Sequence, residues 1–311
     1  MILTVTLNTA VDKRYMVENV EIGEVQRVKE VQNTAGGKGL NVSRVAALAG
    51  QDVCAMGFVG GHNGDLFTSL ITEPTIEAAF TKIAGETRSC VNVIDTVNGT
   101  GTEFLEPGKP VSPEETDRFL ADYTAKLGEA DVVVLAGSMP QGLPTDFYAT
   151  LVNLAKDAGK KVILDTSGAS LNAAVAASKP TMIKPNEDEI QQICQVDINS
   201  REELVAAAQS LQATGIEIVA ISLGGDGVLV VTDSGVYAGQ IPPMKVVNTT
   251  GCGDSMVAGF AVGMATGKTL EETIGFAVSV ASANALSEKT GDFAQADLED
   301  LLGKVTVSKL S

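Results

Sequence analysis

Apolar, strand-like runs alternate with amphipathic stretches along most of this 311-residue chain. Strands are expected at Ile2–Leu7, Val53–Phe58, Val132–Leu135, Lys161–Asp165, Thr181–Lys184 and Ile218–Ser222. Helices are expected between them, at Glu114–Lys126, Asp146–Ala158 and Arg201–Ala213. Because strands that alternate with helices form parallel sheets with both faces covered, the pattern predicts an α/β fold with a mainly parallel central sheet. Ligands of such sheets bind beyond the carboxyl ends of the strands.

Two regions depart from this alternation. Asp12–Thr34 mixes charged residues with β-formers, and Arg88–Leu105 contains a β-forming run before the pair Asn98-Gly99, which is typical of a hairpin. We interpret them as strands of a small lid sheet, within 12–34 and 88–105; ordinary surface hairpins are the alternative. After residue 254 we expect helices at Asp254–Thr266, Leu270–Ser287 and Ala296–Leu302, then a short strand within Val305–Leu310. Lid and body together are expected to form a single domain over 1–311.

Composition and charge exclude several functional classes. A net charge of −17 disfavours nucleic acid as a partner. Four scattered cysteines make structural zinc improbable and suit a reducing compartment. The one histidine, His62, falls in an expected solvated loop, which argues against histidine triads and histidine metal sites. With no signal peptide or spanning segment recognised, we expect a cytoplasmic protein without a membrane partner.

The segment Thr249–Ser255 carries the strongest chemical signal. Its glycines, Gly251 and Gly253, allow a tight turn before an expected helix, and such a turn suits an anion such as a transferring phosphoryl group. Asp254 lies at the mouth of the turn and could accept a proton from a hydroxyl. The helix start is expected to keep the pKa of Asp254 low and, narrowly, to lower that of the Cys252 thiol. A plain glycine turn with Asp254 as a helix cap is the alternative.

Two further glycine clusters could approach phosphates. Ala35–Val42 opens an expected helix at Asn41–Ala49 and places Lys38 among three glycines. Ser222–Gly227 joins a strand to the β run Val228–Val231 and would allow close approach of a nucleotide. A loop with a solvated lysine and a simple hairpin turn are the respective alternatives.

The segment Lys184–Glu189 follows a strand and offers oxygen ligands. If a helix begins here, Asn186 and Glu189 lie on one face and suit Mg²⁺, although acids in a first helical turn are common without any metal. Gly263–Thr269 resembles a P-loop but is one residue short and follows a helix. We therefore interpret it as a helix C-terminus with Gly267 as the cap.

Together these segments resemble the ribokinase-like sugar kinases of the phosphofructokinase B family, over essentially the whole chain, with most similarity to bacterial 1-phosphofructokinases and tagatose-6-phosphate kinases. The motifs that carry the resemblance are Thr6-Leu7-Asn8 with Asp12, Gly36–Val42, Gly57-Phe58 with Gly60-Gly61, Thr87-Arg88, Gly137-Ser138 with Pro140 and Gly142, Asp165 with Ser167-Gly168, Lys184–Asn186 with Glu189, Ser222–Gly224 with Gly227, and Gly251–Ser255 with Ala258-Gly259. Thr9 and Cys252 depart from the residues common in that family, without removing a catalytic group.

The resemblance implies a three-layer sandwich with a β-sheet lid, ATP and Mg²⁺ as cofactors, and a role for each matching residue. It implies that Asp254 is the base and that the γ-phosphate is bound by the N–H groups of Gly251, Cys252 and Gly253. It implies that the sugar is held by Asp12, Gly37, Lys38 and Asn41, and that the phosphate already on the sugar is bound by Lys38 and Arg88. It also implies that Mg²⁺ is held through water by Asn186 and Glu189, that the nucleotide is bound by Lys184, Ser222, Gly224 and Gly227, and that Asn284 lies near the adenine. The lid is also expected to pair with a second subunit's lid in a homodimer.

The resemblance also implies which compound accepts the phosphoryl group, namely a ketohexose monophosphate. We place fructose 1-phosphate first by a small margin, because the wider family favours 1-phosphofructokinase. Tagatose 6-phosphate is the alternative, since Thr34–Val42 and Glu86–Cys90 look more like the tagatose-6-phosphate kinases. Arg88 disfavours an unphosphorylated sugar or nucleoside. A sugar-phosphate sensor without catalysis is the rival from another class, and an intact Asp254 with its flanking glycines argues against it.

Overall fold

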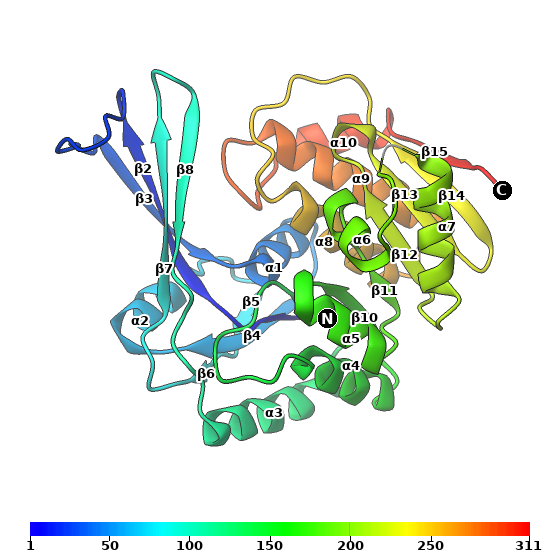
Figure 1. The fold of residues 1–311 in the computed structure, drawn as a ribbon, viewed down its shortest axis with the longest axis horizontal. Helices are drawn as coiled ribbons and strands as arrows, with labels where there is room; N and C mark the ends of the chain where they lie inside the picture. The colour runs from blue at the N-terminus through cyan, green and yellow to red at the C-terminus, as the bar shows by residue number, and fades with distance from the viewer. Residues whose placement is uncertain (199) are drawn as a thin grey trace.

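The computed structural model describes residues 1–198 and 200–311, and a large sheet forms the centre of the molecule (Figure 1). Its strands are β1 (Ile2–Thr6), β4 (Val53–Val59), β5 (Ile76–Ala78), β6 (Thr81–Lys82), β9 (Val132–Ala136), β10 (Lys161–Asp165), β11 (Met182–Ile183), β12 (Ile218–Ser222), β13 (Val228–Thr232), β14 (Gly235–Gln240) and β15 (Thr306–Lys309). Their order is β15-β14-β13-β12-β11-β10-β9-β1-β4-β5, with β6 also paired to β4. Pairing is parallel from β12 to β5 and antiparallel from β12 to β15. The predicted mainly parallel sheet is confirmed.

Helices cover both faces of this sheet and give the predicted three layers. One buried cluster joins the sheet to α1 (Lys38–Leu48), α2 (Gly61–Ser69), α8 (Cys252–Ala265), α9 (Leu270–Leu286) and α10 (Gln295–Leu302). The other joins it to α3 (Pro113–Leu127), α4 (Phe147–Asp157), α5 (Gly168–Ala177), α6 (Glu187–Cys194) and α7 (Arg201–Gln212). Successive residues of β9 alternate between the two clusters, because side chains of a strand point to opposite faces.

A second, four-stranded sheet stands away from the body as the predicted lid (Figure 1). Its strands are β2 (Ala10–Val17), β3 (Glu30–Gly36), β7 (Arg88–Asp95) and β8 (Thr100–Leu105), in the order β3-β2-β7-β8. The first strand begins at Ala10, two residues before the predicted Asp12. Gly99 has the positive φ of 64° that the hairpin between β7 and β8 requires, which confirms the Asn-Gly turn.

Some local predictions were wrong or incomplete. His62 lies exposed in the first turn of α2 and not in a loop. The strand β14 was not predicted, and β11 covers two residues of the expected four. Gly267 has φ 69° just after α8, as the interpretation of that segment as a helix end predicted. Among the described residues, no helix has the length and apolar character needed to cross a membrane.

Candidate active site

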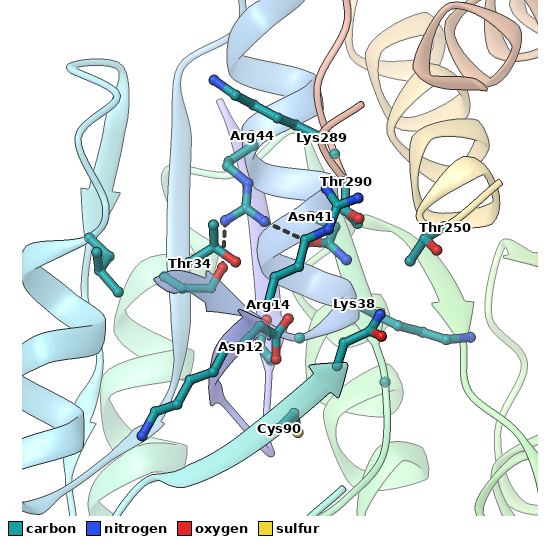
Figure 2. Close-up of a pocket in the computed structure, with 18 of the residues that line it drawn as sticks. Asp12, Arg14, Thr34, Lys38, Asn41, Arg44, Cys90, Thr250, Lys289 and Thr290 are labelled. Atoms are coloured by element: carbon teal, nitrogen blue, oxygen red, sulfur yellow. Dashed lines mark hydrogen bonds between the residues drawn. The ribbon is translucent and has the colours of Figure 1, made fainter. Parts of the chain in front are cut away.

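A cavity of about 920 Å³ lies between the lid and the body (Figure 2). Thr6 and Gly137 place it just beyond the carboxyl ends of β1 and β9, where a parallel sheet is expected to bind its ligand. Its charged lining comes from both walls and comprises Asp12, Lys13, Arg14, Lys38, Arg44, Glu73, Arg88, Glu103, Lys289 and Asp292. A polar and charged compound of sugar-phosphate size is therefore the kind of ligand that the cavity suits.

Asp254 lies in the first turn of α8, directly behind the cavity wall. Gly251 at the N-cap has φ 82°, which permits the turn that brings the carboxylate inward. The Asp254 side chain is only 7% exposed, and its Oδ2 accepts a 2.7 Å hydrogen bond from Asn41 Nδ2. Burial, followed by the negative charge of Asp165, raises the pKa of Asp254 to about 6, against the opposing effects of Lys38, Asn41 and Lys184. The predicted low pKa is thus wrong, because desolvation outweighs the helix start.

Two lysines meet at one buried carboxylate, Asp165, at the end of β10. Lys38 Nζ lies 3.4 Å from Asp165 Oδ2, and Lys184 Nζ lies 3.6 Å from Asp165 Oδ1. Burial lowers the pKa of Lys38, but the negative charges of Asp165 and Asp254 raise it by more than burial lowers it. The net pKa is therefore raised, and the ammonium stays charged. Lys184 Nζ also lies 3.5 Å from the point that a Cβ of Gly253 would occupy, so its charge reaches the glycine turn. An anion at this turn would meet two cations held by one carboxylate.

The turn itself is only partly free to bind an anion through its backbone. First-turn N–H groups of a helix have no partner inside the helix, which leaves them available to a ligand. Of the three predicted donors, the Cys252 N–H already donates to Thr249 O at 3.3 Å. Gly251 and Gly253 bound the first turn on either side of it.

The pKa of the Cys252 thiol is raised and not lowered as predicted. Burial is the largest effect on its pKa and raises it, and the charge of Asp254 raises it further. The Asn284 amide, whose Nδ2 lies 3.4 Å from Cys252 Sγ, works in the other direction without reversing the shift. The expectation that the helix start lowers the thiol pKa is therefore wrong.

Asn284, predicted near the adenine, is fully buried on α9. Its Nδ2 donates to Thr250 O at 3.0 Å, and its Oδ1 accepts from the N–H groups of Gly291 at 2.9 Å and Asp292 at 3.3 Å. These bonds brace the glycine turn against the loop after α9. A direct contact with an adenine ring would require some of them to open.

Asp12, one of the residues predicted to hold the sugar, projects from β2 into the cavity (Figure 2). Burial raises its pKa to about 6, although the nearby Arg44 and Arg88 oppose the shift. A Cβ on Gly36 would lie 2.1 Å from Asp12 Oδ2, so only glycine leaves room for this carboxylate. Gly37, with φ 109°, is the N-cap of α1 and turns Lys38 and Asn41 toward the same space.

Arg88 lies at the root of the lid and holds two parts of the chain together. Its Nη1 donates to Glu106 O at 2.9 Å and its Nη2 to Asn8 O at 3.1 Å. Its buried Nε has no hydrogen-bond partner among the described residues. Arg88 also lines the cavity, so its positive charge is placed to act on an anionic group there.

The predicted nucleotide and metal residues form a separate group at the ends of β11 and β12. None of Lys184, Asn186, Glu189, Ser222, Gly224 and Gly227 is among the residues that line the cavity beneath the lid. Asn186 Oδ1 accepts from Glu189 N at 2.8 Å, and Glu189 Oε2 accepts from Asn186 N at 2.9 Å, so the pair forms a capping box at the start of α6. Residue 186 also bridges to residue 222 on β12. The segment thus forms the helix start that was the alternative to a metal site. The second carboxylate oxygen of Glu189 takes no part in the capping box.

The glycines after β12 differ in what they do. Gly224, with φ 53°, has open space around it, as a nucleotide site would need. Gly227, with φ 91°, faces the backbone of β14: a Cβ there would lie 2.0 Å from Gly239 O. Gly227 is therefore required by sheet packing, whatever it binds.

Three functional candidates were missed from sequence. Asp165 was noted only as part of a motif, yet it joins the two lysines. Arg44 contacts Asn41, and their spacing of three residues on a helix is the signal that could have revealed it. Arg14, on the lid, donates to Glu288 O of the body at 3.1 Å, a contact between distant segments that no local pattern indicates.

A three-layer α/β body, a β-sheet lid and a buried carboxylate at a glycine turn together define a ribokinase-like kinase of small molecules. A family model described as pfkB family carbohydrate kinase matches residues 5–297. The chain belongs to this family.

Relatives and solved structures agree with this assignment. The chain is 40% identical over 309 residues to a tagatose-6-phosphate kinase of Staphylococcus epidermidis, covering 99% of both chains. It matches the structure of a possible 1-phosphofructokinase of Thermotoga maritima with TM-score 0.90 and 27% identity, over 100% of both chains. It also matches Arabidopsis thaliana ribokinase with TM-score 0.78 and 22% identity, over 97% of this chain and 98% of that chain, which shows a shared fold.

Proposed function

We propose that the protein transfers the γ-phosphoryl group of ATP to a hydroxyl of a ketohexose monophosphate, which yields a bisphosphate. The observation that carries this proposal is the buried Asp254 carboxylate beside a glycine turn, with Lys184 close to that turn and Lys38 bound to the same carboxylate, Asp165, as Lys184. The cavity between lid and body adds cations from both walls, which an acceptor that already bears a phosphate would need.

Each residue has a role that follows from its position. Asp254, fixed by Asn41, orients the acceptor hydroxyl and takes its proton as the oxygen bonds to phosphorus. Lys184 and the first-turn N–H groups of α8 stabilise charge on the transferring group. Asp12 and Asn41 hold sugar hydroxyls, and Arg88 with Lys38 binds the phosphate already on the sugar. The lid excludes water, which would otherwise compete as acceptor.

Mg²⁺ would sit on the nucleotide side, near Asn186 and Glu189. Among the described residues there is no group of three or more His, Cys, Asp and Glu side chains that could hold a metal ion. This fits Mg²⁺, which keeps several waters and binds mainly to substrate phosphates, with one or two carboxylates. The carboxylate oxygen of Glu189 that is not part of the capping box can reach such an ion through water.

For the acceptor itself we now place tagatose 6-phosphate first. A whole-length identity of 40% to a tagatose-6-phosphate kinase supports this choice. Fructose 1-phosphate, which the sequence alone placed first by a small margin, is supported by a whole-length structural match at 27% identity. Both acceptors are ketohexose monophosphates, so the same cations would serve either one.

A coupled ADP-release assay with MgATP tests the function. The panel is tagatose 6-phosphate, fructose 1-phosphate, fructose 6-phosphate and free fructose, each with kcat/KM determined. We expect the highest kcat/KM for tagatose 6-phosphate and the lowest for free fructose. An Asp254→Asn preparation measures contaminating kinase. Binding of these sugar phosphates without ADP release would favour the sensor and contradict the proposal.

We also propose that the lid forms a homodimer contact. Val31 and Phe104 on the lid strands are exposed, at 52% and 61%, and the strand register puts both on the face of the lid sheet opposite to Asp12, which is unusual for large apolar side chains. A second lid would cover them. Light scattering after size-exclusion chromatography should give twice the 32.1 kDa chain mass, and Phe104→Glu should reduce it. A monomeric wild type at micromolar concentration would contradict this.

A further inference from the structure

Arg44 lies three residues after Asn41 on α1 and contacts it directly (Figure 2). Its Nη2 donates to Asn41 Oδ1 at 2.7 Å, and its Nη1 donates to Ala35 O at 2.5 Å. The guanidinium is thereby held at both ends, between the last residues of β3 and the side chain of Asn41. Because the two donors belong to one rigid plane, the position of one contact fixes the position of the other.

This contact decides which end of the Asn41 amide faces the proposed base. A guanidinium can only donate, so the atom of Asn41 that faces Arg44 must be the oxygen. The NH₂ end then faces Asp254 and donates the 2.7 Å bond to its Oδ2. A rotated amide would put two oxygen atoms against each other at Asp254 and leave two donors together at Arg44. The observed orientation satisfies both bonds, and the reversed one satisfies neither.

The arrangement forms a linear relay of two hydrogen bonds from Arg44 through Asn41 to Asp254. We propose that Arg44 is a positioning residue for phosphoryl transfer, which fixes the Asn41 amide so that the Asp254 carboxylate is held toward the acceptor hydroxyl. The inference rests on the proposed role of Asp254 as the base. The new element is that Arg44, a residue of the cavity wall outside the motif Gly36–Val42, orients the base through Asn41.

The charges around the relay are consistent with this role. Arg44 is within electrostatic reach of Glu73, Asp12, Asp254 and Asp292. The carboxylate of Asp254 is also affected by Asp165, Lys38 and Lys184, and it in turn affects Cys252. Arg44 thus acts on Asp254 from the Asn41 side, whereas Lys38 and Lys184 act from the Asp165 side. Its loss would remove positive charge from one side alone.

A double-mutant cycle in the full-length enzyme tests the relay, with tagatose 6-phosphate and MgATP as substrates. We expect Arg44→Met and Asn41→Leu each to lower kcat by about 10- to 100-fold, as a small misplacement of a catalytic group can do. The double variant should be no slower than the slower single variant, because both substitutions break the same relay. Losses that multiply would overturn the proposal. KM for ATP should stay within about twofold in all three, since a general disturbance of the fold would move it as well.

The pH dependence of kcat gives a second readout. The hydrogen bond from Asn41 lowers the pKa of Asp254, so when Arg44→Met releases the Asn41 amide the carboxyl should be harder to ionise and the acid limb of the profile should move to higher pH. An acid limb identical to that of the wild type would contradict the assignment. Arg118 offers a matched control, because its exposed guanidinium donates to Lys82 O at 2.8 Å away from the cavity. Arg118→Met should change neither kcat nor the profile.

Two further variants, Arg44→Lys and Asp254→Asn, complete the test. If Arg44→Met does not fold, as judged by circular dichroism and thermal unfolding, the cycle is repeated with Arg44→Lys, which keeps the charge but cannot reproduce the planar pair of contacts. Multiplying losses there would again overturn the proposal. Asp254→Asn in the same assay separates the two levels: near-normal turnover would refute the proposed function, whereas an inactive Asp254→Asn with an additive cycle would refute the Arg44 relay alone.

Discussion

The two walls of the cavity are built in different ways. On the body wall, Asp254 and Asp165 are 7% and 1% exposed and are held by Asn41 and by two lysines, respectively. On the lid wall, Leu105 lines the cavity with 63% of its surface exposed, and Arg14 reaches over to donate to the Glu288 carbonyl of the body. Burial raises the pKa of one carboxyl on each wall to about 6, Asp254 on the body and Asp12 on the lid, so the two walls differ in how their side chains are held and not in carboxyl pKa.

The lid wall is suited to recognition instead. Its residues Asp12, Arg14 and Arg88 reach the cavity from the separate four-stranded lid sheet, which can move as a unit when a substrate enters. We therefore expect the two walls to serve different steps. Substitutions on the body wall should affect kcat, and substitutions on the lid wall should affect KM. Each of the following predictions tests that division.

The largest effect is expected from Asp254→Asn, which removes the proton acceptor and keeps the turn. We expect kcat to fall by about two to four orders of magnitude, with ATP binding retained. In the wild type, kcat should fall about tenfold per pH unit below pH 6, because the raised pKa of about 6 leaves the base protonated there. Steady-state assays from pH 5 to 8 measure both. Near-normal turnover would rule out Asp254 as the base.

Stability provides the control for this variant. Burial raises the pKa of Asp254 from 3.8 to about 6, so its contribution to the stability of the folded state is greatest below pH 3.8 and is lost as the pH rises through 6. A neutral asparagine avoids that loss. We expect Asp254→Asn to unfold with a free energy up to about 3 kcal/mol higher at pH 8, with no advantage near pH 4. A variant less stable at pH 8 would mean that its low activity reflects unfolding.

Arg88→Ala tests the lid side of the comparison. The lost charge-assisted contact should raise KM for the phosphorylated sugar by about 10- to 100-fold, while KM for ATP and kcat change little. Arg88 also bonds the carbonyls of Asn8 and Glu106, so a lower thermal midpoint is expected as well. A change in ATP affinity alone would show that the sugar phosphate does not bind at this end of the cavity.

The sequence predicted the fold well because the fold depends on patterns that repeat. The parallel strands and the Asn98-Gly99 hairpin are local signals, and the structure has them within a few residues of the predicted bounds. The pKa values of Asp254 and Cys252 could not be predicted in the same way. Helix position, which can be inferred from sequence, lowers both, but burial, which depends on packing between α1, α8 and α9, raises them more.

Contacts between distant segments were also beyond local patterns. Asp165 joins Lys38 and Lys184, which lie 127 and 19 positions away from it in the chain. The motifs supplied all three residues without indicating that one carboxylate holds both ammonium groups. Asn284 was assigned to the nucleotide by resemblance, which stays a prediction, and no local pattern indicated its four partners inside the protein.

Glu189→Gln should have a moderate effect on the nucleotide side. The glutamine can keep the cap on α6, because its amide oxygen still accepts from Asn186 N, but it loses the charge that favours Mg²⁺. We expect the Mg²⁺ concentration for half-maximal turnover to rise severalfold, with an unchanged thermal midpoint. An unchanged Mg²⁺ curve would assign Asn186 and Glu189 to helix capping alone.

Cys252→Ala should have the smallest effect, although the residue lies at the centre of the proposed anion site. Its Sγ is partly buried against Asn284 and the Asn248 carbonyl, and both burial and Asp254 raise the thiol pKa. At pH 7 the thiol is therefore protonated and slow to react, while any binding to phosphate would go through backbone N–H groups that alanine also has. We expect kcat within about twofold of the wild type and little inactivation by iodoacetamide in an hour. Rapid alkylation of Cys252, located by mass spectrometry and prevented by MgATP, would mean that the helix start outweighs burial at this turn, and that the body wall is less closed to water than its carboxylates indicate.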